Sequence, residues 1–297
     1  MEKLKIDITI PGDEELRQQM LEAYKKCPQV IKYCNDLKIP PEVVEDNIVK
    51  VYDMVSDVNY CSKCPGVNKC AKANPLLCVK LVYKQGEVDR QLVPCKELLR
   101  DMVFKNQFLI RDFEEEWLES NLRSIDRTAG RNKALALYTD FIKNKQNHWI
   151  YLTGNKHSGR SYFAASLVVD AARRERGQIC FLNSTLRFRE LNDLGYGKKK
   201  EEFDKRLELY SNVPILVLDD FGNEYKNDFV RDAILFPILS TRASKRLLTI
   251  FTSDFTIEEI ETLYSTSKAG AIRAKQISKL IKSMSKEEIN LGEIAIY

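Results

Sequence analysis

The chain has 297 residues, of which 44% are hydrophobic and 30% are charged, so it can form two ordinary domains or one large domain with an appendage. Its 47 basic and 43 acidic residues nearly cancel to a net charge of +4, which excludes a strongly basic nucleic-acid tail and an acidic disordered chain. The sequence shows no signal-peptide core at its start and no run of about 18 apolar residues, so we expect a soluble, cytoplasmic protein without a membrane span.

The first third of the chain is predicted to be helical and to end in a hairpin. Apolar residues recur at three- and four-residue spacing over residues 14–56, which is typical of amphipathic helices. Residues 77–83 and 88–93 then alternate like two strands on either side of a turn at residues 84–87. We therefore expect a small, mainly helical domain that carries a hairpin.

Cysteines gather around this hairpin. Five of the eight lie within 35 residues, namely Cys61, Cys64, Cys70, Cys78 and Cys95. Because thiols stay reduced in the cytoplasm, disulfides do not explain this clustering, and a structural zinc site does. The alternative is a set of free buried thiols.

The spacing of these cysteines selects four candidate ligands. Residues 61–64 form a C-x2-C knuckle, in which two thiolates can bind one zinc ion. If the hairpin is centred between residues 86 and 87, Cys78 lies directly opposite Cys95 and the pair completes a tetrahedral site. The predicted ligands are Cys61, Cys64, Cys78 and Cys95. Cys70 can replace one of them or be a small buried thiol, and the metal has a structural role in either case.

The second part of the chain alternates helical and strand patterns. Short apolar runs at residues 148–153, 178–183, 214–220 and 246–254 are separated by helical segments. This alternation is typical of a parallel sheet that is covered by helices on both faces. We place a helical plus zinc-binding domain at residues 1–110, a polar linker at 111–128, and an α/β domain at 129–297.

A glycine loop follows the first strand of the second domain. It consists of Gly154, Asn155, Lys156, His157, Ser158, Gly159, Arg160 and Ser161. It fits the pattern G-x4-G-K-[ST] except that Arg160 takes the place of lysine. In such a loop, backbone N–H groups cradle phosphates and the Ser hydroxyl reaches Mg²⁺, although glycine loops also occur as ordinary turns. We predict a site for ATP with Mg²⁺ and, because arginine does not replace lysine conservatively, inefficient turnover.

Acidic residues at the ends of two later strands support this site. Asp219 and Asp220 end the strand at 214–220, as in a Walker B segment that places one carboxylate (Asp219) on Mg²⁺ and another (Asp220) near the attacking water. Asp254 closes the next strand, where a polar side chain would contact the γ-phosphate or the water. Paired acids can also mark only the start of a helix, but a phosphate loop upstream favours the nucleotide site.

These three elements in this order, after a cysteine-rich module, resemble the DnaI-type primosomal helicase loaders of bacteria, which are AAA+ proteins. The resemblance covers nearly the whole chain, with residues 217–224 matching the Walker B segment, 230–232 in the next helix, and 251–255 matching the sensor-1 segment. It implies that residues 1–110 bind the DnaB-type hexameric replicative helicase. It also implies an AAA+ domain that assembles with further copies, contacts single-stranded DNA, and helps to place the helicase in replication initiation or restart.

The chain departs from the family pattern at several positions. Arg160 replaces the phosphate-loop lysine, and Asp254 replaces the sensor-1 asparagine, which puts a negative charge close to the γ-phosphate. Where the family carries arginines in a late helix, this chain has Gln276 and Leu280, and Arg273 lies one turn earlier. We therefore expect weak or absent hydrolysis, with binding and scaffolding retained.

Other interpretations stay open from the sequence. Residues 273–286 carry five basic residues and no acid, and they either line DNA phosphates or form a solvated helix face. An ATPase helper of DNA transposition has a closely similar AAA+ domain but lacks the cysteine-rich module. A nucleotide-independent scaffold with a degenerate AAA+ fold is the third possibility.

Overall fold

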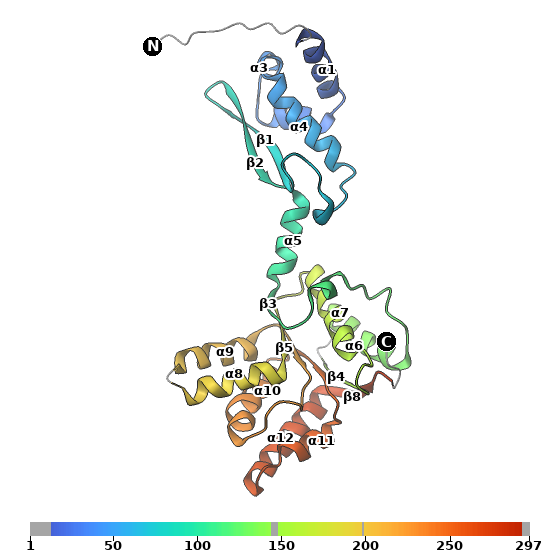
Figure 1. Ribbon diagram of the computed structural model, residues 1–297, viewed down its shortest axis with the longest axis vertical. Helices are drawn as coiled ribbons and strands as arrows, with labels where there is room; N and C mark the ends of the chain where they lie inside the picture. The colour runs from blue at the N-terminus through green and yellow to red at the C-terminus, as the bar shows by residue number, and fades with distance from the viewer. Residues whose placement is uncertain (1–12, 144–147, 198, 293–297) are drawn as a thin grey trace. The chain divides into compact units, whose positions relative to one another are not determined.

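The structure is a computed structural model that describes residues 13–143, 148–197 and 199–292, and it divides into two compact units between Val103 and Phe104 (Figure 1). The first unit contains helices α1 (Asp13–Lys25), α2 (Pro28–Asp36), α3 (Pro41–Asp46) and α4 (Ile48–Cys61), the short 3-10 helix η1 (Val67–Lys69), and strands β1 (Leu77–Lys84) and β2 (Glu87–Pro94). Prolines at the first positions of α2 and α3 favour helix starts there. Val51 and Val55 of α4 pack with Leu81 and Val88 of the hairpin, so the hairpin covers the helical core. Helix α5 (Lys96–Asn106) follows.

The register of the hairpin differs from the sequence prediction. The two strands are joined by the two-residue turn Gln85–Gly86, whose φ angles of 53° and 84° are both left-handed, as a tight hairpin turn favours. Cys78 therefore pairs with Val93, and the predicted direct opposition of Cys78 and Cys95 is wrong. The error arose because glutamine gives no sequence signal for a left-handed conformation.

The second unit contains a six-stranded parallel sheet in the order β3-β5-β6-β7-β4-β8. Its strands are β3 (Phe108–Arg111), β4 (Trp149–Thr153), β5 (Ile179–Asn183), β6 (Ile215–Asp219), β7 (Leu248–Thr252) and β8 (Ser285–Asn290). The predicted α/β fold and its four predicted strands are confirmed. The edge strands β3 and β8 were not predicted.

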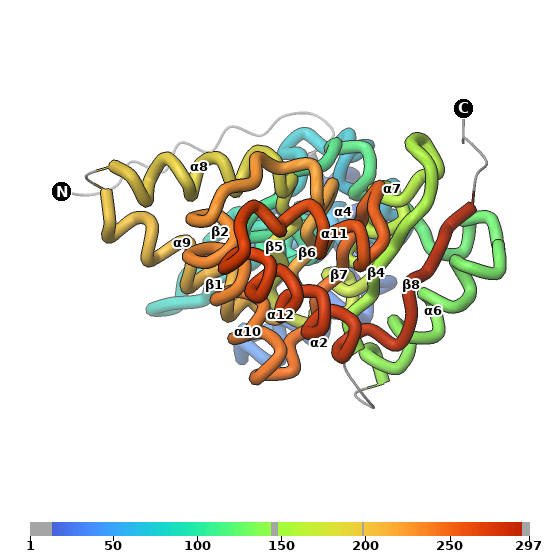
Figure 2. Tube along the Cα trace, turned by 90° about the horizontal axis from the view of Figure 1, so that it is seen from below, coloured from blue at the N-terminus to red at the C-terminus, as the bar shows by residue number. Residues whose placement is uncertain are grey.

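Helices cover both faces of this sheet (Figure 2). Alternate residues of each strand point to opposite faces, so Leu216 and Leu218 of β6 belong to one core while Ile215 and Val217 belong to the other. One face is covered by α6 (Ala129–Ile142) and α7 (Arg160–Arg173). The other is covered by α8 (Ser184–Tyr196), α9 (Lys200–Asn212), the π-helical η3 (Val230–Leu235), α10 (Phe236–Ser244), α11 (Ile257–Tyr264) and α12 (Lys268–Met284).

The residues expected to form a linker, 111–128, belong instead to the second unit. β3 pairs with β5, and Phe113 packs edge-on against Phe181 of the core. Trp117, in the 3-10 helix η2 (Glu115–Glu119), stacks on Phe113. The acidic run beside these aromatic residues hid their burial from the sequence pattern.

Among the helices that the structure describes, none combines the length and the apolar composition that crossing a membrane requires.

Candidate nucleotide-binding site

The order of the strands brings three predicted segments to one edge of the sheet. β7 lies between β6 and β4, and all three strands run parallel, so their carboxyl ends meet. The glycine loop follows β4, Asp219 and Asp220 lie at the end of β6, and Asp254 follows β7. This edge is where parallel α/β sheets commonly bind ligands.

The glycine loop has the features of a phosphate cradle. Gly154 and Gly159 have φ angles of 145° and 77°, so the chain curves through conformations that side chains other than glycine rarely adopt. α7 begins directly after Gly159, and no side chain caps its first turn. The backbone N–H groups of that turn can therefore donate hydrogen bonds to a phosphate. Ser158 is only 2% exposed, yet its Oγ has no hydrogen-bond partner. These residues fit a bound phosphate chain.

His157 is a strained member of this loop. Its φ angle of 66° lies in the left-handed region, which costs a residue other than glycine on the order of 1 kcal/mol. The curvature of the loop is therefore maintained by the surrounding structure against a local preference.

Arg160 contacts the neighbouring loop instead of extending into solvent. Its Nη1 donates to the carbonyl oxygens of Gly154, at 2.7 Å, and of Ser253, while Nη2 donates to Oδ1 of Asp254. The side chains of Arg160 and Asp254 are only 10% and 17% exposed. Burial opposes ionisation of Asp254, but hydrogen bonds from Arg160 and Asn223 outweigh it and hold the pKa of this carboxyl below its usual value.

A polar network joins the three carboxylates at this edge. Asp219 is almost buried, which raises its pKa, and its Oδ1 accepts a hydrogen bond of 2.6 Å from Thr252 Oγ1. Thr252 Oγ1 in turn accepts from the N–H of Asp220 at 3.0 Å. Asn223 Nδ2 donates both to Asp220 Oδ1, at 2.7 Å, and to Asp254 Oδ2, at 3.0 Å. Thr252 and Asn223 thus position acids that the sequence had singled out separately.

Glu224, which sequence analysis did not select, anchors the loop after β6. It is 1% exposed, and its carboxylate accepts hydrogen bonds from the N–H of Gly222, at 2.8 Å, and from the hydroxyl of Tyr264 in α11. Burial raises the pKa of Glu224 to about 7. The segment that carries Asp220 is thereby tied to α11.

Arg131 approaches the loop from the first turn of α6. The side chain is 5% exposed, and Nη2 donates to the carbonyl oxygen of Ser158 at 3.4 Å, while Nη1 donates to that of Asp126 at 3.1 Å. No spacing or motif in the sequence indicates this contact, because Arg131 and Ser158 meet only through the packing of α6 beside β4.

Gln276 and Leu280, the positions at which the loader family carries arginines, lie in α12 together with Arg273. Arg273 places its guanidinium 3.9 Å from the ring centre of Phe236, donates to Gln276 Oε1 at 2.8 Å, and lies 3.5 Å from Asp232 Oδ1. Leu280 packs against the core of the same face. Among the basic residues in 273–286, Arg273 therefore contacts side chains of α12, η3 and α10. Lys282 pairs with Glu258 at 3.0 Å.

The five clustered cysteines lie in the first unit, but the structure does not gather them into one group. The Sγ atoms of Cys61 and Cys78 are 3.9 Å apart. Cys70 accepts a hydrogen bond from the N–H of Leu76 at 3.4 Å, Cys95 accepts one from Leu98, and Cys64 is exposed. Within residues 13–143, 148–197 and 199–292, no three His, Cys, Asp or Glu side chains are grouped so that they could hold a metal ion.

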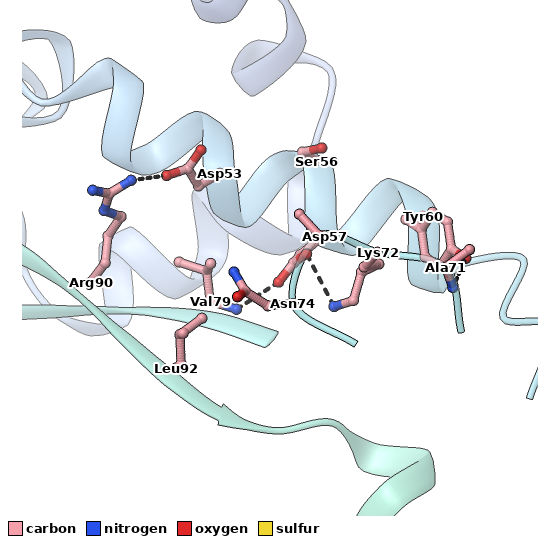
Figure 3. Close-up of a pocket in the computed structure, with 11 residues that line it drawn as sticks. Asp53, Ser56, Asp57, Tyr60, Ala71, Lys72, Asn74, Val79, Arg90 and Leu92 are labelled. Atoms are coloured by element: carbon pink, nitrogen blue, oxygen red, sulfur yellow. Dashed lines mark hydrogen bonds and ion pairs between the residues drawn. The ribbon is translucent and has the colours of Figure 1, made fainter. Parts of the chain in front are cut away.

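A cavity of about 610 Å³ lies between α4 and the hairpin of the first unit (Figure 3). Its charged side chains are paired with one another: Asp53 with Arg90, and Asp57 with Lys72 at 3.1 Å. Asp57 also accepts a hydrogen bond of 2.6 Å from the N–H of Val79 in β1. The Asp53–Arg90 pair and the hydrogen bond from Val79 to Asp57 connect the hairpin to α4.

The sequence of the chain is similar to those of known ATP-binding proteins and helicase loaders. Residues 74–274 match the family described as IstB-like ATP binding protein. The chain is 23% identical over 283 residues to the replicative helicase loader DnaI of Bacillus subtilis (strain 168), and the alignment covers 92% of this chain and 89% of the loader. The predicted resemblance to DnaI-type loaders is confirmed.

Two solved structures share the fold. The crystal structure of DnaI superposes with a TM-score of 0.55 at 24% identity, over 65% of this chain and 99% of that chain. A putative primosome component from Streptococcus pyogenes serotype M3 gives a TM-score of 0.51 at 23% identity, over 66% of this chain and 98% of that chain.

Proposed function

The chain belongs to the IstB-like ATP-binding protein family, and from this premise we propose that it is a cytoplasmic primosomal helicase loader. It binds a DnaB-type hexameric replicative helicase and helps to place it on single-stranded DNA in replication initiation or restart. The observation that carries the proposal is the extent of the similarity to the loader of Bacillus subtilis. At 92% of this chain, the alignment must include most of the first unit as well as the sheet domain.

We assign the phosphates of a bound nucleotide to residues 154–161, at the start of α7. The glycine curvature, the uncapped helix start and the unpartnered Ser158 Oγ support this assignment. Ser161 and Asp219 would hold Mg²⁺, which when bound supplies charge neutralisation for the phosphates. In this proposal Asp220 would orient a water, and Arg160 is already bonded to the loop carbonyls and to Asp254. Hydrolysis is therefore weak, which a phosphate-release assay on the purified chain checks.

We propose that the second unit also contacts single-stranded DNA and assembles with further copies of the chain. Exposed lysines on α12, Lys275 and Lys279, support a phosphate contact because they carry no acidic neighbour within residues 273–286. We assign helicase binding to the first unit, whose cysteine-rich module an ATPase helper of transposition lacks.

Helicase capture tests the loader function. The full chain, immobilised, is expected to retain its purified cognate replicative helicase in the absence of nucleotide, and not to retain a transposase. Retention of the transposase alone would support the transposition helper instead. Retention of neither protein would refute the proposed function. Capture in the presence of a zinc chelator shows whether the cysteine region contributes.

We further propose that the first unit holds one structural zinc ion through Cys61, Cys64, Cys78 and Cys95. The Sγ–Sγ distance of 3.9 Å between Cys61 and Cys78 supports it, because two thiolates about 2.3 Å from a tetrahedral zinc ion lie about 3.8 Å apart.

Elemental analysis of the purified chain is expected to find one zinc per molecule. Cys61→Ser should release most of the metal and lower the melting temperature of the first unit, since metal binding contributes to folding. Cys27→Ala, a buried cysteine of the same unit outside the cluster, is the control and should keep the metal. A metal-free wild-type chain would contradict the assignment.

A further inference from the structure

We propose that this site selects a nucleoside diphosphate over a nucleoside triphosphate, because Arg160 and Asp254 form a fixed ion pair where the third phosphate must lie. The inference rests on the proposed nucleotide site and adds the class of ligand that it takes. It treats the two substitutions as one device instead of two independent losses.

The first step is that the positive charge of Arg160 is already paired within the protein. Every hydrogen bond described for its guanidinium goes to an acceptor of the protein: two loop carbonyls and Asp254. The guanidinium links the loop after β4 to the loop after β7, across 94 positions of sequence. A lysine at this position of a phosphate loop normally reaches the outer phosphates with an unshared charge.

The second step is that Asp254 is held in place from two sides. Arg160 binds Oδ1, and Asn223 binds Oδ2 at 3.0 Å. The same amide of Asn223 binds Asp220, so the carboxylate cannot swing away without breaking the network that positions Asp220. The carboxylate of Asp254 is therefore held in its pair with Arg160 at the end of the loop.

The third step compares what each phosphate needs. The phosphates nearest the helix start depend on backbone N–H groups and on the glycine curvature, which this loop retains. A further phosphate adds negative charge and depends on the cation at position 160. Here that cation is already neutralised by Asp254, so it offers the added phosphate no net attraction. The penalty falls on the triphosphate and spares the diphosphate.

The experiment measures the affinity of the full chain for ADP and for a non-hydrolysable ATP analogue, each with Mg²⁺, by titration calorimetry. The wild-type chain is expected to bind ADP at least tenfold more tightly than the analogue. Asp254→Asn combined with Arg160→Lys is expected to abolish this preference by strengthening analogue binding at least tenfold. The wild-type ratio decides the proposal even if the double variant fails to fold.

Glu258→Gln combined with Lys282→Arg is the matched control. It alters the solvent-exposed ion pair between α11 and α12 and changes the net charge by the same amount, so it should leave the ADP preference intact. Equal affinities for the two nucleotides, tighter binding of the analogue, or no binding of either by the wild-type chain would overturn the inference. Helicase capture without nucleotide is measured separately, so its failure is distinguishable from these outcomes.

Discussion

Replacing Arg242 by alanine is expected to lower the free energy of unfolding of the second unit by about 3–5 kcal/mol. Its side chain is fully buried in α10, and Nε donates to Thr249 Oγ1 at 2.9 Å. Nη1 donates to the carbonyl oxygens of Tyr210 and Val213 at 3.0 and 2.7 Å, and Nη2 to that of Leu248. The carbonyl oxygens at the C-terminal end of α9 carry partial negative charge, and they stabilise the positive charge of Arg242. Alanine leaves a cavity and buried acceptors without donors.

Urea unfolding followed by tryptophan fluorescence measures this loss. Both tryptophans of the chain, Trp117 and Trp149, lie in the second unit, so the signal reports on that unit. Arg189→Ala, which removes an exposed arginine of α8, should change the free energy of unfolding by less than about 0.5 kcal/mol. A loss below about 1 kcal/mol for Arg242→Ala would show that the buried hydrogen bonds are dispensable.

The stability of the second unit is also expected to fall as the pH rises through 7, because of Glu224. Burial raises its pKa from 4.5 to about 7, so the folded protein binds the proton more tightly than the unfolded chain does. The stabilisation by the protonated carboxyl is therefore complete below about pH 4.5 and is lost as the pH rises through 7. At about 1.4 kcal/mol per pH unit, the change amounts to about 3 kcal/mol.

Comparing the wild-type chain with Glu224→Gln isolates this contribution. Glutamine is neutral at every pH, so the difference between the unfolding free energies of the two proteins should change by about 2–3 kcal/mol between pH 5 and pH 8, in favour of the variant at pH 8. Glu208→Gln, an exposed position of α9, is the control and should show no such trend. Parallel stability profiles for wild type and Glu224→Gln would contradict the prediction.

The sheet domain was predictable where strands were continuous apolar runs with polar residues at their ends. β4, β6 and β7 satisfy this description, because a central parallel strand is buried on both faces. β8 did not satisfy it: its sequence, SKEEIN, is polar, and only its pairing with β4 makes it a strand. Edge strands with charged residues are common because they resist further pairing, and this also makes them hard to detect.

In the candidate site, too, some features follow from local sequence patterns and others follow only from the fold. The amino-acid pattern was sufficient to locate the glycine loop of residues 154–161 and the acidic strand end at Asp219, because local spacing along the chain defines both. It also marked Arg160 and Asp254 as unusual residues, yet it treated the charge of Asp254 as a separate loss. The mutual neutralisation of these two side chains is visible only in the folded chain, because the order of the strands, which no local pattern encodes, places the loops after β4 and β7 side by side.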